Sequence, residues 1–461
     1  MKRSYYVYVL LCVVAHIHLN GQHLARKGYL GIYPSDFKKD SLSTGISQSI
    51  RGAQVQQLVT GATAENAGVK VHDIVVRLNG TAIQNAADLK EFSQRLRGGD
   101  SIHFTVFREN RFEVLKGIIQ SRPFENTVGS RVDYTEVSFD GGYLRSIVHI
   151  PKGKGPFPVV YYIQGYPCSS VEYPNDSNPF KKLTDFWVRH GFIVYKIEKP
   201  GMGDSVNREP CDQISFGKES EAFKAGYQQL LKLREVDTSK VFIYGHSLGG
   251  AHAPLLVETF QPSGIMVYGV SGQSWYDYIS KLIIQQLPLF GISYTDAESL
   301  LKSNRQALFD FFIAKNTPFE IVQNQPDARN FFTHILKYDG RDHIFGRHYQ
   351  FWQDLNSQNI AHNWSAVACP VLAMYGEADI EALDASGANR IVRIVNNDHP
   401  GKAIFKLIEG TDHALIQTGS KANGVRHKKQ GTYLKIATEQ FNKAYPEMLT
   451  NWMQSILDNI K

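Results

Sequence analysis

Six short apolar runs recur along the last three quarters of the chain, and stretches with helical periodicity separate them. Strands that alternate with helices in this way form a largely parallel sheet with helices on both faces. Ahead of these runs, residues 132–150 predict an antiparallel hairpin that turns at Asp140-Gly141-Gly142. The pattern therefore predicts an α/β fold, with core strands at residues 159–163, 192–197, 241–244, 265–270, 371–375 and 403–407.

Three short motifs follow the ends of predicted strands and carry the candidate chemistry. A serine stands between two glycines, an acid follows an apolar run, and a histidine comes late in the chain: Gly245-His246-Ser247-Leu248-Gly249, Tyr375-Gly376-Glu377-Ala378-Asp379 and Gly410-Thr411-Asp412-His413. A serine hydroxyl is a weak nucleophile near neutral pH, so it needs a histidine to take its proton and an acid to orient the imidazole. We predict that Ser247 attacks, His413 relays the proton and Asp379 orients His413.

Neighbouring residues offer alternatives to these roles. Asp412 adjoins His413, but adjacent residues on a loop rarely orient each other's side chains, so Asp379 is the favoured acid. His246 is expected to shape the turn around Ser247 without acting as a base. The helix that follows Ser247 is predicted over residues 250–260.

The order Ser, Asp, His resembles the α/β-hydrolase triad, with a serine on a strand-to-helix turn. The loop Gln164-Gly165-Tyr166-Pro167 resembles the His-Gly-x-Pro element of that superfamily, with Gln164 in place of the histidine. The resemblance implies an α/β-hydrolase fold and an oxyanion hole made by the backbone N–H groups of Leu248 and Tyr166.

The strand rhythm stops between residues 271 and 366, where helical patterns rich in aromatic residues take over. This is the usual position of the superfamily's helical cap, expected here at about residues 272–365. Such a cap would exclude water and supply the substrate pocket. Most of its aromatic side chains should form the cap's own core, and a few should face substrate.

Residues 28–121 resemble a PDZ domain of the bacterial, protease-associated type. The carboxylate-binding loop of that family corresponds to Tyr29, Leu30, Gly31 and Ile32, and an amphipathic helix is predicted over residues 88–96. The resemblance implies a groove that could receive a peptide or protein C-terminus. Binding of a tail of its own chain and packing against the catalytic domain are the alternatives, and the apolar stripe Leu89, Phe92 and Leu96 is expected in the core.

The N-terminus has the pattern of a secretory signal peptide. Lys2 and Arg3 precede an apolar run over residues 5–17, which is too short to span a bilayer comfortably. We expect residues 1–21 to be removed, with cleavage after Ala15 as the alternative. The mature protein would then comprise a PDZ domain at 22–122 and a hydrolase domain at 123–461, exported to the periplasm or secreted, with no stable membrane span.

Export changes the interpretation of the cysteines. Cys168 and Cys211 lie on loops that follow adjacent parallel strands, so in an oxidising compartment they could form a disulfide at the rim of the active site. Cys369 opens the strand before Asp379 and is expected to be a buried free thiol.

Composition excludes several classes of function. The 461 residues carry a formal charge of only +6, and the basic cluster at 426–429 has no interleaved aromatics, so we interpret it as a solvated loop and expect no nucleic-acid partner. The histidines of the cap region have no metal-ligand spacing, so neither a metal nor another cofactor is expected: His334, His343, His348 and His362.

The function expected is that of an esterase or acyl hydrolase acting on a small ester. One alternative is a serine peptidase of the prolyl-oligopeptidase type, although the roughly 95 residues before the hydrolase are too few for the β-propeller that usually gates such enzymes. A second alternative is a scaffold protein in which the PDZ domain binds a partner and the hydrolase domain is a relic.

Overall fold

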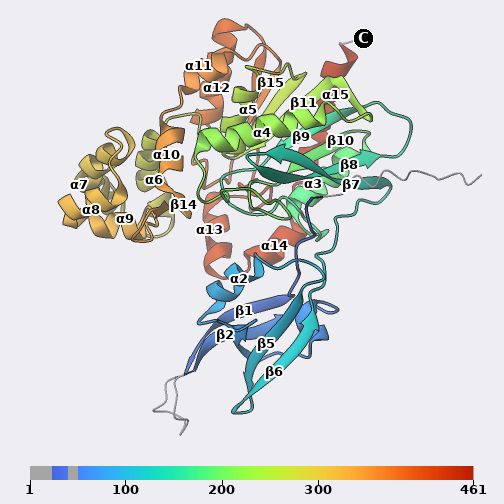
Figure 1. Ribbon diagram of the computed structural model, residues 1–461. Coiled ribbons are helices and arrows are strands. Elements are labelled where there is room, and N and C mark those ends of the chain that lie inside the picture. The colour runs from blue at the N-terminus through green and yellow to red at the C-terminus, as the bar shows by residue number, and fades with distance from the viewer. Residues whose placement is uncertain (1–22, 40–49, 460–461) are drawn as a thin grey trace, which may run out of the picture.

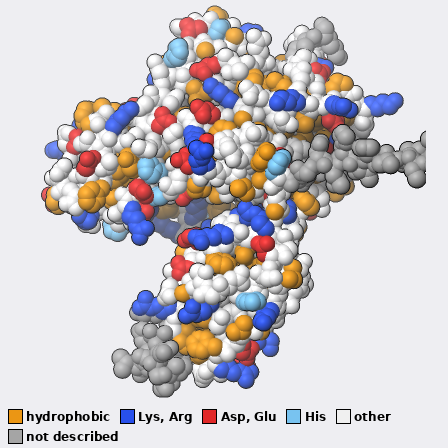
Figure 2. Space-filling view, viewed as in Figure 1, with side chains coloured by type: hydrophobic (Ala, Val, Ile, Leu, Met, Phe, Trp, Pro, Cys, Tyr) orange, Lys and Arg blue, Asp and Glu red, His pale blue; other side chains and the backbone are white. Residues whose placement is uncertain are grey.

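The computed structural model describes residues 23–39 and 50–459, which form a small N-terminal domain and a larger domain above it (Figure 1). The predicted signal peptide, residues 1–21, lies outside the described residues. No helix in the described ranges is both long and apolar enough to cross a membrane. On the face seen in Figure 2, basic and acidic side chains are interspersed.

The N-terminal domain is built on one antiparallel sheet with the order β1-β2-β3-β5-β6, in which β4 pairs with β3. Its core contains Leu30, Val55, Val75, Leu89 and Phe104. The elements are β1 (Ile32–Lys39), β2 (Ile50–Leu58), α1 (Thr63–Asn66), β3 (Ile74–Leu78), β4 (Thr81–Ala82), α2 (Ala86–Ser93), β5 (Ser101–Arg108) and β6 (Arg111–Ile118).

Helix α2 differs from the predicted helix at 88–96. It starts earlier because the Asn85 side chain caps it by accepting the N–H of Asp88. It ends at Ser93 because the next N–H groups bond to carbonyls three residues back, which tightens the last turn. Leu96 therefore lies beyond the helix, but it is buried in the core together with Leu89, as the apolar stripe predicts.

The larger domain contains an eight-stranded sheet with the order β16-β15-β12-β11-β9-β10-β8-β7. The strands from β10 to β16 pair in parallel, whereas β7 and β8 form the predicted antiparallel hairpin at one edge. This order, with helices on both faces, is the α/β-hydrolase fold. The strands are β7 (Ser130–Phe139), β8 (Gly142–Pro151), β9 (Phe157–Ile163), β10 (Ile193–Ile197), β11 (Val236–His246), β12 (Gly264–Tyr268), β15 (Val371–Gly376) and β16 (Ala403–Ile408).

Two apolar layers hold the sheet between its helices. One face packs on α3 (Pro179–Arg189) and α15 (Ala444–Asp458). The other face packs on α4 (Phe216–Leu230), α5 (Gly249–Leu256) and α12 (Ser386–Asp398). Helix α5 ends four residues before the predicted limit of residue 260, because Val257 and Thr259 bond to carbonyls three residues back.

The basic cluster at 426–429 is not the predicted loop. It forms the last turn of α13 (Lys421–Lys429), which the Ser420 side chain caps by accepting the N–H of Asn423. Cations in the last turn of a helix are stabilised by the helix dipole, so the charges that indicated a loop favour a helix end instead. Helix α14 (Tyr433–Glu439) follows.

The insertion between β12 and β15 is a helical cap (Figure 1). The core of the cap, which includes Phe311, Phe332 and Trp352, packs on Phe216 and Leu248 of the sheet-containing part of the same domain. The cap elements are α6 (Trp275–Leu289), α7 (Tyr294–Phe312), α8 (Pro318–Asn324), η2 (Pro326–Ala328), α9 (Arg329–His334), β13 (His343–Ile344), β14 (Arg347–His348), α10 (Tyr349–Asn356) and α11 (Ile360–Ser365).

A buried ionic junction joins the two domains just before the N-terminal sheet begins. Arg26 pairs with Glu172 and, at 2.9 Å, with Asp204. The backbone N–H of Lys27 also donates to Asp204 at 2.7 Å. All three charged side chains are at most 11% exposed, so they stabilise one relative orientation of the domains.

Candidate active site

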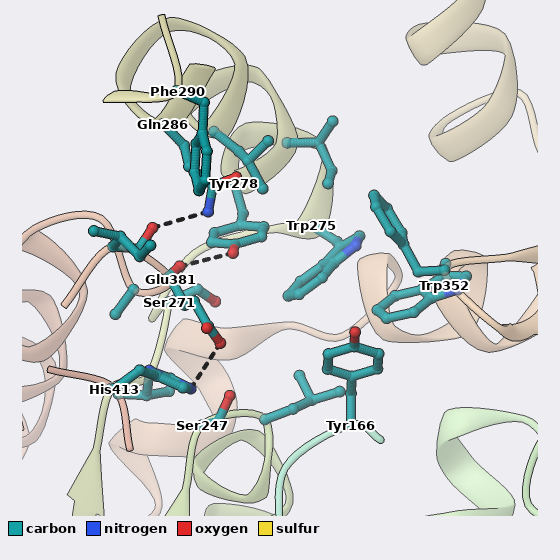
Figure 3. A pocket seen from close by; sticks show the side chains of 18 of the residues that line it. Tyr166, Ser247, Ser271, Trp275, Tyr278, Gln286, Phe290, Trp352, Glu381 and His413 are labelled. Carbon is teal, nitrogen blue, oxygen red and sulfur yellow. Dashed lines mark hydrogen bonds and ion pairs between the residues drawn. The ribbon is translucent and has the colours of Figure 1, made fainter. Parts of the chain in front are cut away.

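Ser247 lies on the sharp turn between β11 and α5. Its φ of 55° is in the left-handed region, which a residue other than glycine adopts only where the surrounding structure holds it. The backbone N–H of Ser247 donates to the carbonyl oxygen of Tyr268 at 2.8 Å, which fixes the turn. The side chain consequently projects into a cavity above the sheet (Figure 3).

His413 and Asp379 come from the loops after β16 and β15, and Figure 3 shows His413 beside Ser247. The imidazole Nδ1 lies 2.7 Å from the Asp379 Oδ2. The other carboxylate oxygen accepts the N–H groups of Glu381 at 2.7 Å and Ala382 at 2.9 Å. Burial alone would raise the pKa of Asp379, but His413 and these N–H groups outweigh it and lower the pKa, which keeps the carboxylate charged.

The neighbouring residues have other partners. The Asp412 carboxylate accepts the N–H groups of Ala414 and Ile416 and the hydroxyl of Tyr433, and it makes no hydrogen bond to the His413 ring. The His246 Nε2 lies 2.8 Å from the His413 carbonyl oxygen, and burial lowers the pKa of His246 to about 3. A neutral His246 thus donates to the backbone that carries His413.

Tyr166 and Leu248, whose backbone N–H groups are the predicted oxyanion donors, both line the cavity above the sheet. Among the described residues, neither the N–H of Tyr166 nor that of Leu248 has a hydrogen-bond acceptor. Gly165 allows the loop to approach the nucleophile, because a Cβ at this position would lie 2.9 Å from the Ser247 Cβ. The geometry leaves both donors available to an oxygen at the reacting carbon.

Gly269 is needed at this site and was not among the predicted residues. It has a φ of +67°, and a Cβ there would lie 2.8 Å from the His413 ring and 3.1 Å from Asp379. A glycine near the end of the apolar run at 265–270 was the only signal in the sequence. Its role became visible only when three distant strand ends were brought together.

Ser247 and His413 line a cavity of about 290 Å³ between the sheet and the cap. Apolar and aromatic side chains make most of its wall (Figure 3). The cap contributes Trp275, Tyr278, Phe290, Phe345 and Trp352. Other cap aromatics, including Phe311 and Phe332, lie in the cap's own core, as the sequence predicts for most of them.

A carboxylate and a lysine interrupt this apolar wall, and neither was predicted. The Glu381 Oε2 lies 3.6 Å from the Nε2 of His413, and its Oε1 lies 3.2 Å from the Nζ of Lys428. Burial lowers the pKa of His413, but Asp379 and Glu381 outweigh burial and raise it to about 9. Glu381 therefore favours the protonated imidazole.

Two cysteines lie on loops at the carboxyl ends of the strands, and the third, Cys369, lies before the start of β15. The Sγ atoms of Cys168 and Cys211 form a disulfide and are 2.07 Å apart. Cys369 is a free thiol, and burial raises its pKa to about 12, so it stays protonated and unreactive.

The N-terminal domain has a separate groove of about 550 Å³. The predicted carboxylate loop, from Tyr29 to Ile32, lines one side of it, and Ala86, Leu89 and Lys90 of α2 line the other. The loop and α2 thus meet as the resemblance implies.

One group in the described part of the chain has the spacing to gather three metal ligands. Asp339, Asp342 and His343 approach one another at the surface of the cap, far along the chain from Ser247. Exposed acidic groups of this kind are common, and the group gives no reason to assign a metal.

Comparison with known families agrees with this geometry. A family model described as "X-Pro dipeptidyl-peptidase (S15 family)" matches residues 140–405, more than half of the chain. The chain belongs to the S15 family. A second model, described as "PDZ domain", matches residues 28–116.

Curated relatives match the two parts of this S15-family protein separately. "Esterase EstD" of Thermotoga maritima is 20% identical over 286 residues, which cover 62% of this chain and 61% of the relative. A "Probable periplasmic serine endoprotease DegP-like" of Rhizobium meliloti is 32% identical over 98 residues, which cover 21% of this chain and 19% of that relative. The chain therefore spans about three fifths of the first relative's length and about a fifth of the second's.

Among solved structures, "Est1E from Butyrivibrio proteoclasticus" is 14% identical to this S15-family chain. The matched region covers 70% of this chain and 99% of the Est1E chain, with a TM-score of 0.42. The family match and the sheet order make residues 140–405 part of an α/β-hydrolase domain of the S15 family, preceded by a PDZ domain.

Proposed function

We propose that the protein hydrolyses carboxylic esters through an acyl-enzyme on Ser247. His413 takes the hydroxyl proton as the Ser247 Oγ attacks the ester carbonyl, and the N–H groups of Leu248 and Tyr166 stabilise the oxyanion. Collapse of this intermediate expels the alcohol, which receives the proton from His413. Water then attacks the acyl-enzyme by the same steps and releases the acid and free Ser247.

One observation carries this proposal. Ser247, on a left-handed turn, and His413 belong to the wall of one cavity, and Asp379 lies 2.7 Å from the His413 Nδ1. Asp379 is fully buried and charged, so it holds the imidazole with Nδ1–H toward itself and leaves Nε2 for the serine.

An ester is the proposed substrate because the wall of the cavity is mainly apolar and a relative bears the name of an esterase. The family description favours a second candidate, cleavage of a peptide bond after proline. Both reactions use the same acyl-enzyme chemistry, so the leaving group and the acyl part decide between them.

The test begins with purified protein and Ser247→Ala. Labelling by a fluorophosphonate probe and turnover of p-nitrophenyl esters are expected to disappear together, with kcat lower by about 10³-fold or more. Ester turnover should exceed turnover of X-Pro p-nitroanilides. Preferred cleavage of the anilides would assign the protein as a peptidase, and full activity of Ser247→Ala would refute the mechanism.

We also propose that the PDZ groove binds the free C-terminus of a peptide. The Tyr29–Ile32 loop supplies backbone N–H groups, and Leu89 on α2 supplies an apolar wall. Fluorescence anisotropy with a library of peptides that end in different apolar residues tests this. Binding should require a free carboxylate, so equal affinity for C-terminally amidated versions of the same peptides would refute it.

Export is the third proposal. The disulfide between Cys168 and Cys211 and the periplasmic DegP-like relatives of the PDZ segment support it. Fractionation of the source cells, with N-terminal sequencing of the mature protein, tests it. Recovery in the cytoplasm with an intact N-terminus would contradict the proposal.

A further inference from the structure

A fully buried ionic cluster lies directly behind the oxyanion loop. Glu219 of α4 is its centre, and it accepts from Lys199 at 3.0 Å, from Arg347 at 2.5 Å and from His252 at 3.2 Å. Each of these side chains is at most 1% exposed. Charges buried this deeply are expensive unless they are paired, so their presence needs an explanation beyond stability.

The cluster comes from four separate parts of the chain, one of which is α5 with His252. Lys199 follows β10, Glu219 lies in α4, and Arg347 lies in β14 of the cap. The Arg347 guanidinium also stacks on Phe351, with its carbon 3.7 Å from the ring centroid. Among the described residues of the cap, Arg347 is the one that forms an ion pair with Glu219, in the interior of the catalytic domain.

Both cations also donate to carbonyl oxygens of the oxyanion loop. The Lys199 Nζ donates to the Gly165 oxygen at 2.6 Å, and the Arg347 Nη1 donates to the Tyr166 oxygen at 2.8 Å. The Glu219 carboxylate also accepts from both cations, from the Lys199 Nζ and from the Arg347 Nη2. The two peptide groups that flank the Tyr166 α-carbon are therefore both held from behind.

The planarity of the peptide bond turns these contacts into an orientation of the oxyanion donor. The Gly165 carbonyl and the Tyr166 N–H belong to one trans peptide group, so they point in opposite directions. When Lys199 binds the carbonyl from behind the loop, the N–H has to point away from Lys199. That N–H is the donor without an acceptor among the described residues.

We propose that Lys199 and Arg347, fixed by Glu219, are positioning residues for the oxyanion hole. The cap then completes the catalytic machinery through Arg347 as well as covering it. This inference rests on the proposed function, since it requires an oxyanion at the Ser247 adduct.

The test compares Arg347→Met with Arg145→Met. Arg145 is a matched control because it is also a buried arginine, 3% exposed, paired with Asp204 at the domain junction. Its described hydrogen bonds and ion pairs do not involve the oxyanion loop. Initial rates on p-nitrophenyl butyrate give kcat per active site, with sites counted by complete fluorophosphonate labelling. Melting temperatures are measured in parallel.

Arg347→Met is expected to lower kcat by about 10- to 100-fold, with KM changed by less than about threefold, because only the transition state uses the hole. The rate of fluorophosphonate labelling should fall with kcat, since its phosphoryl oxygen needs the same donors. Arg347→Lys should restore part of kcat. Arg145→Met should lower the melting temperature but leave kcat within about twofold.

Wild-type kcat in folded Arg347→Met, or an equal fall in Arg145→Met, would overturn the inference. If Arg347→Met does not fold, Arg347→Lys and Glu219→Gln carry the same test with the same expected direction. Ser247→Ala separates a failure of the positioning role from a failure of the proposed function. If that variant is inactive while Arg347→Met is unimpaired, the inference fails and the proposed function stands.

Discussion

The Glu381 carboxylate sets a pH dependence that can be worked out from the site. His413 acts as a base only when its imidazole is neutral, and Asp379 and Glu381 together raise the pKa of that imidazole to about 9. At neutral pH the imidazole is therefore mostly protonated and cannot act as a base, so kcat/KM should rise with pH through about 9. The perturbation that isolates the effect of Glu381 is Glu381→Gln, which keeps the shape and removes the charge.

The magnitude comes from the 3.6 Å between the Glu381 Oε2 and the His413 Nε2. The Glu381 side chain is 44% exposed, so solvent screens the pair and an effective dielectric constant between about 40 and 80 applies. At that distance the attraction is about 1–2 kcal/mol, which corresponds to about one pKa unit. Glu381→Gln should therefore move the midpoint of kcat/KM from about 9 to about 8.

The assay measures kcat/KM for a p-nitrophenyl ester from about pH 6 to about pH 10.5, at constant ionic strength. Glu377→Gln is the control, because Glu377 lies near the same turn but binds the N–H of Gly410 instead of the imidazole. We expect the control to keep the wild-type midpoint. An unchanged or higher midpoint in Glu381→Gln would show that the carboxylate does not act on His413.

Two further predictions concern the frame of the site. Gly269→Ala should lower kcat by about 100-fold, because the added methyl group would lie 2.8 Å from the His413 ring and displace it; initial rates with the melting temperature check this, and normal kcat would contradict it. Loss of the disulfide in Cys168→Ala/Cys211→Ala should lower the free energy of unfolding by about 4 kcal/mol, since it closes a loop of 43 residues in sequence separation. Urea denaturation followed by tryptophan fluorescence measures this in the hydrolase domain alone, because all five tryptophans lie there, and an unchanged midpoint would be evidence against it.

The larger architecture could be predicted because buried parallel strands leave a clear pattern. Five of the six apolar runs are buried on both faces and form continuous hydrophobic stretches, whereas β16, at the sheet edge, exposes Ile404 and Leu407. The strand predictions are accurate to within a few residues. The prediction of an α/β-hydrolase fold preceded by a PDZ domain is confirmed. Helix ends were harder, as α2 and α5 show, because caps and tightened last turns decide them locally.

Some residues of the candidate site could be predicted from the sequence and others could not. Ser247, Asp379 and His413 could be named because each follows a strand end in a recognisable motif. In the structure, Ser247 and His413 line one cavity, and Asp379 contacts the His413 ring. Glu381 and Arg347 carry no motif, because their roles depend on approaching distant segments in space. Lys428 was not predicted at the site because it stands in a run of four basic residues, which suggested a solvated loop. In the structure it lines the cavity and pairs with Glu381.

The cap holds both sides of the cavity, which limits how it can move. On one side, Tyr278 and Gln286 of α6 donate to the carbonyl oxygens of Glu381 at 2.7 Å and Ile380 at 2.9 Å. On the other side, Arg347 holds the oxyanion loop.

Opening the cap as a rigid lid would break the buried Arg347–Glu219 ion pair and the Arg347 hydrogen bond to the oxyanion loop, leaving Glu219 with Lys199 and His252. We therefore expect the cap to stay docked during turnover, with substrate entering beside Phe290 and Lys428, two of the more exposed lining residues. Hydrogen exchange tests this in β14 and α10. Amides there should exchange slowly before and after fluorophosphonate labelling, and fast exchange in the free enzyme would show that the cap opens as a whole.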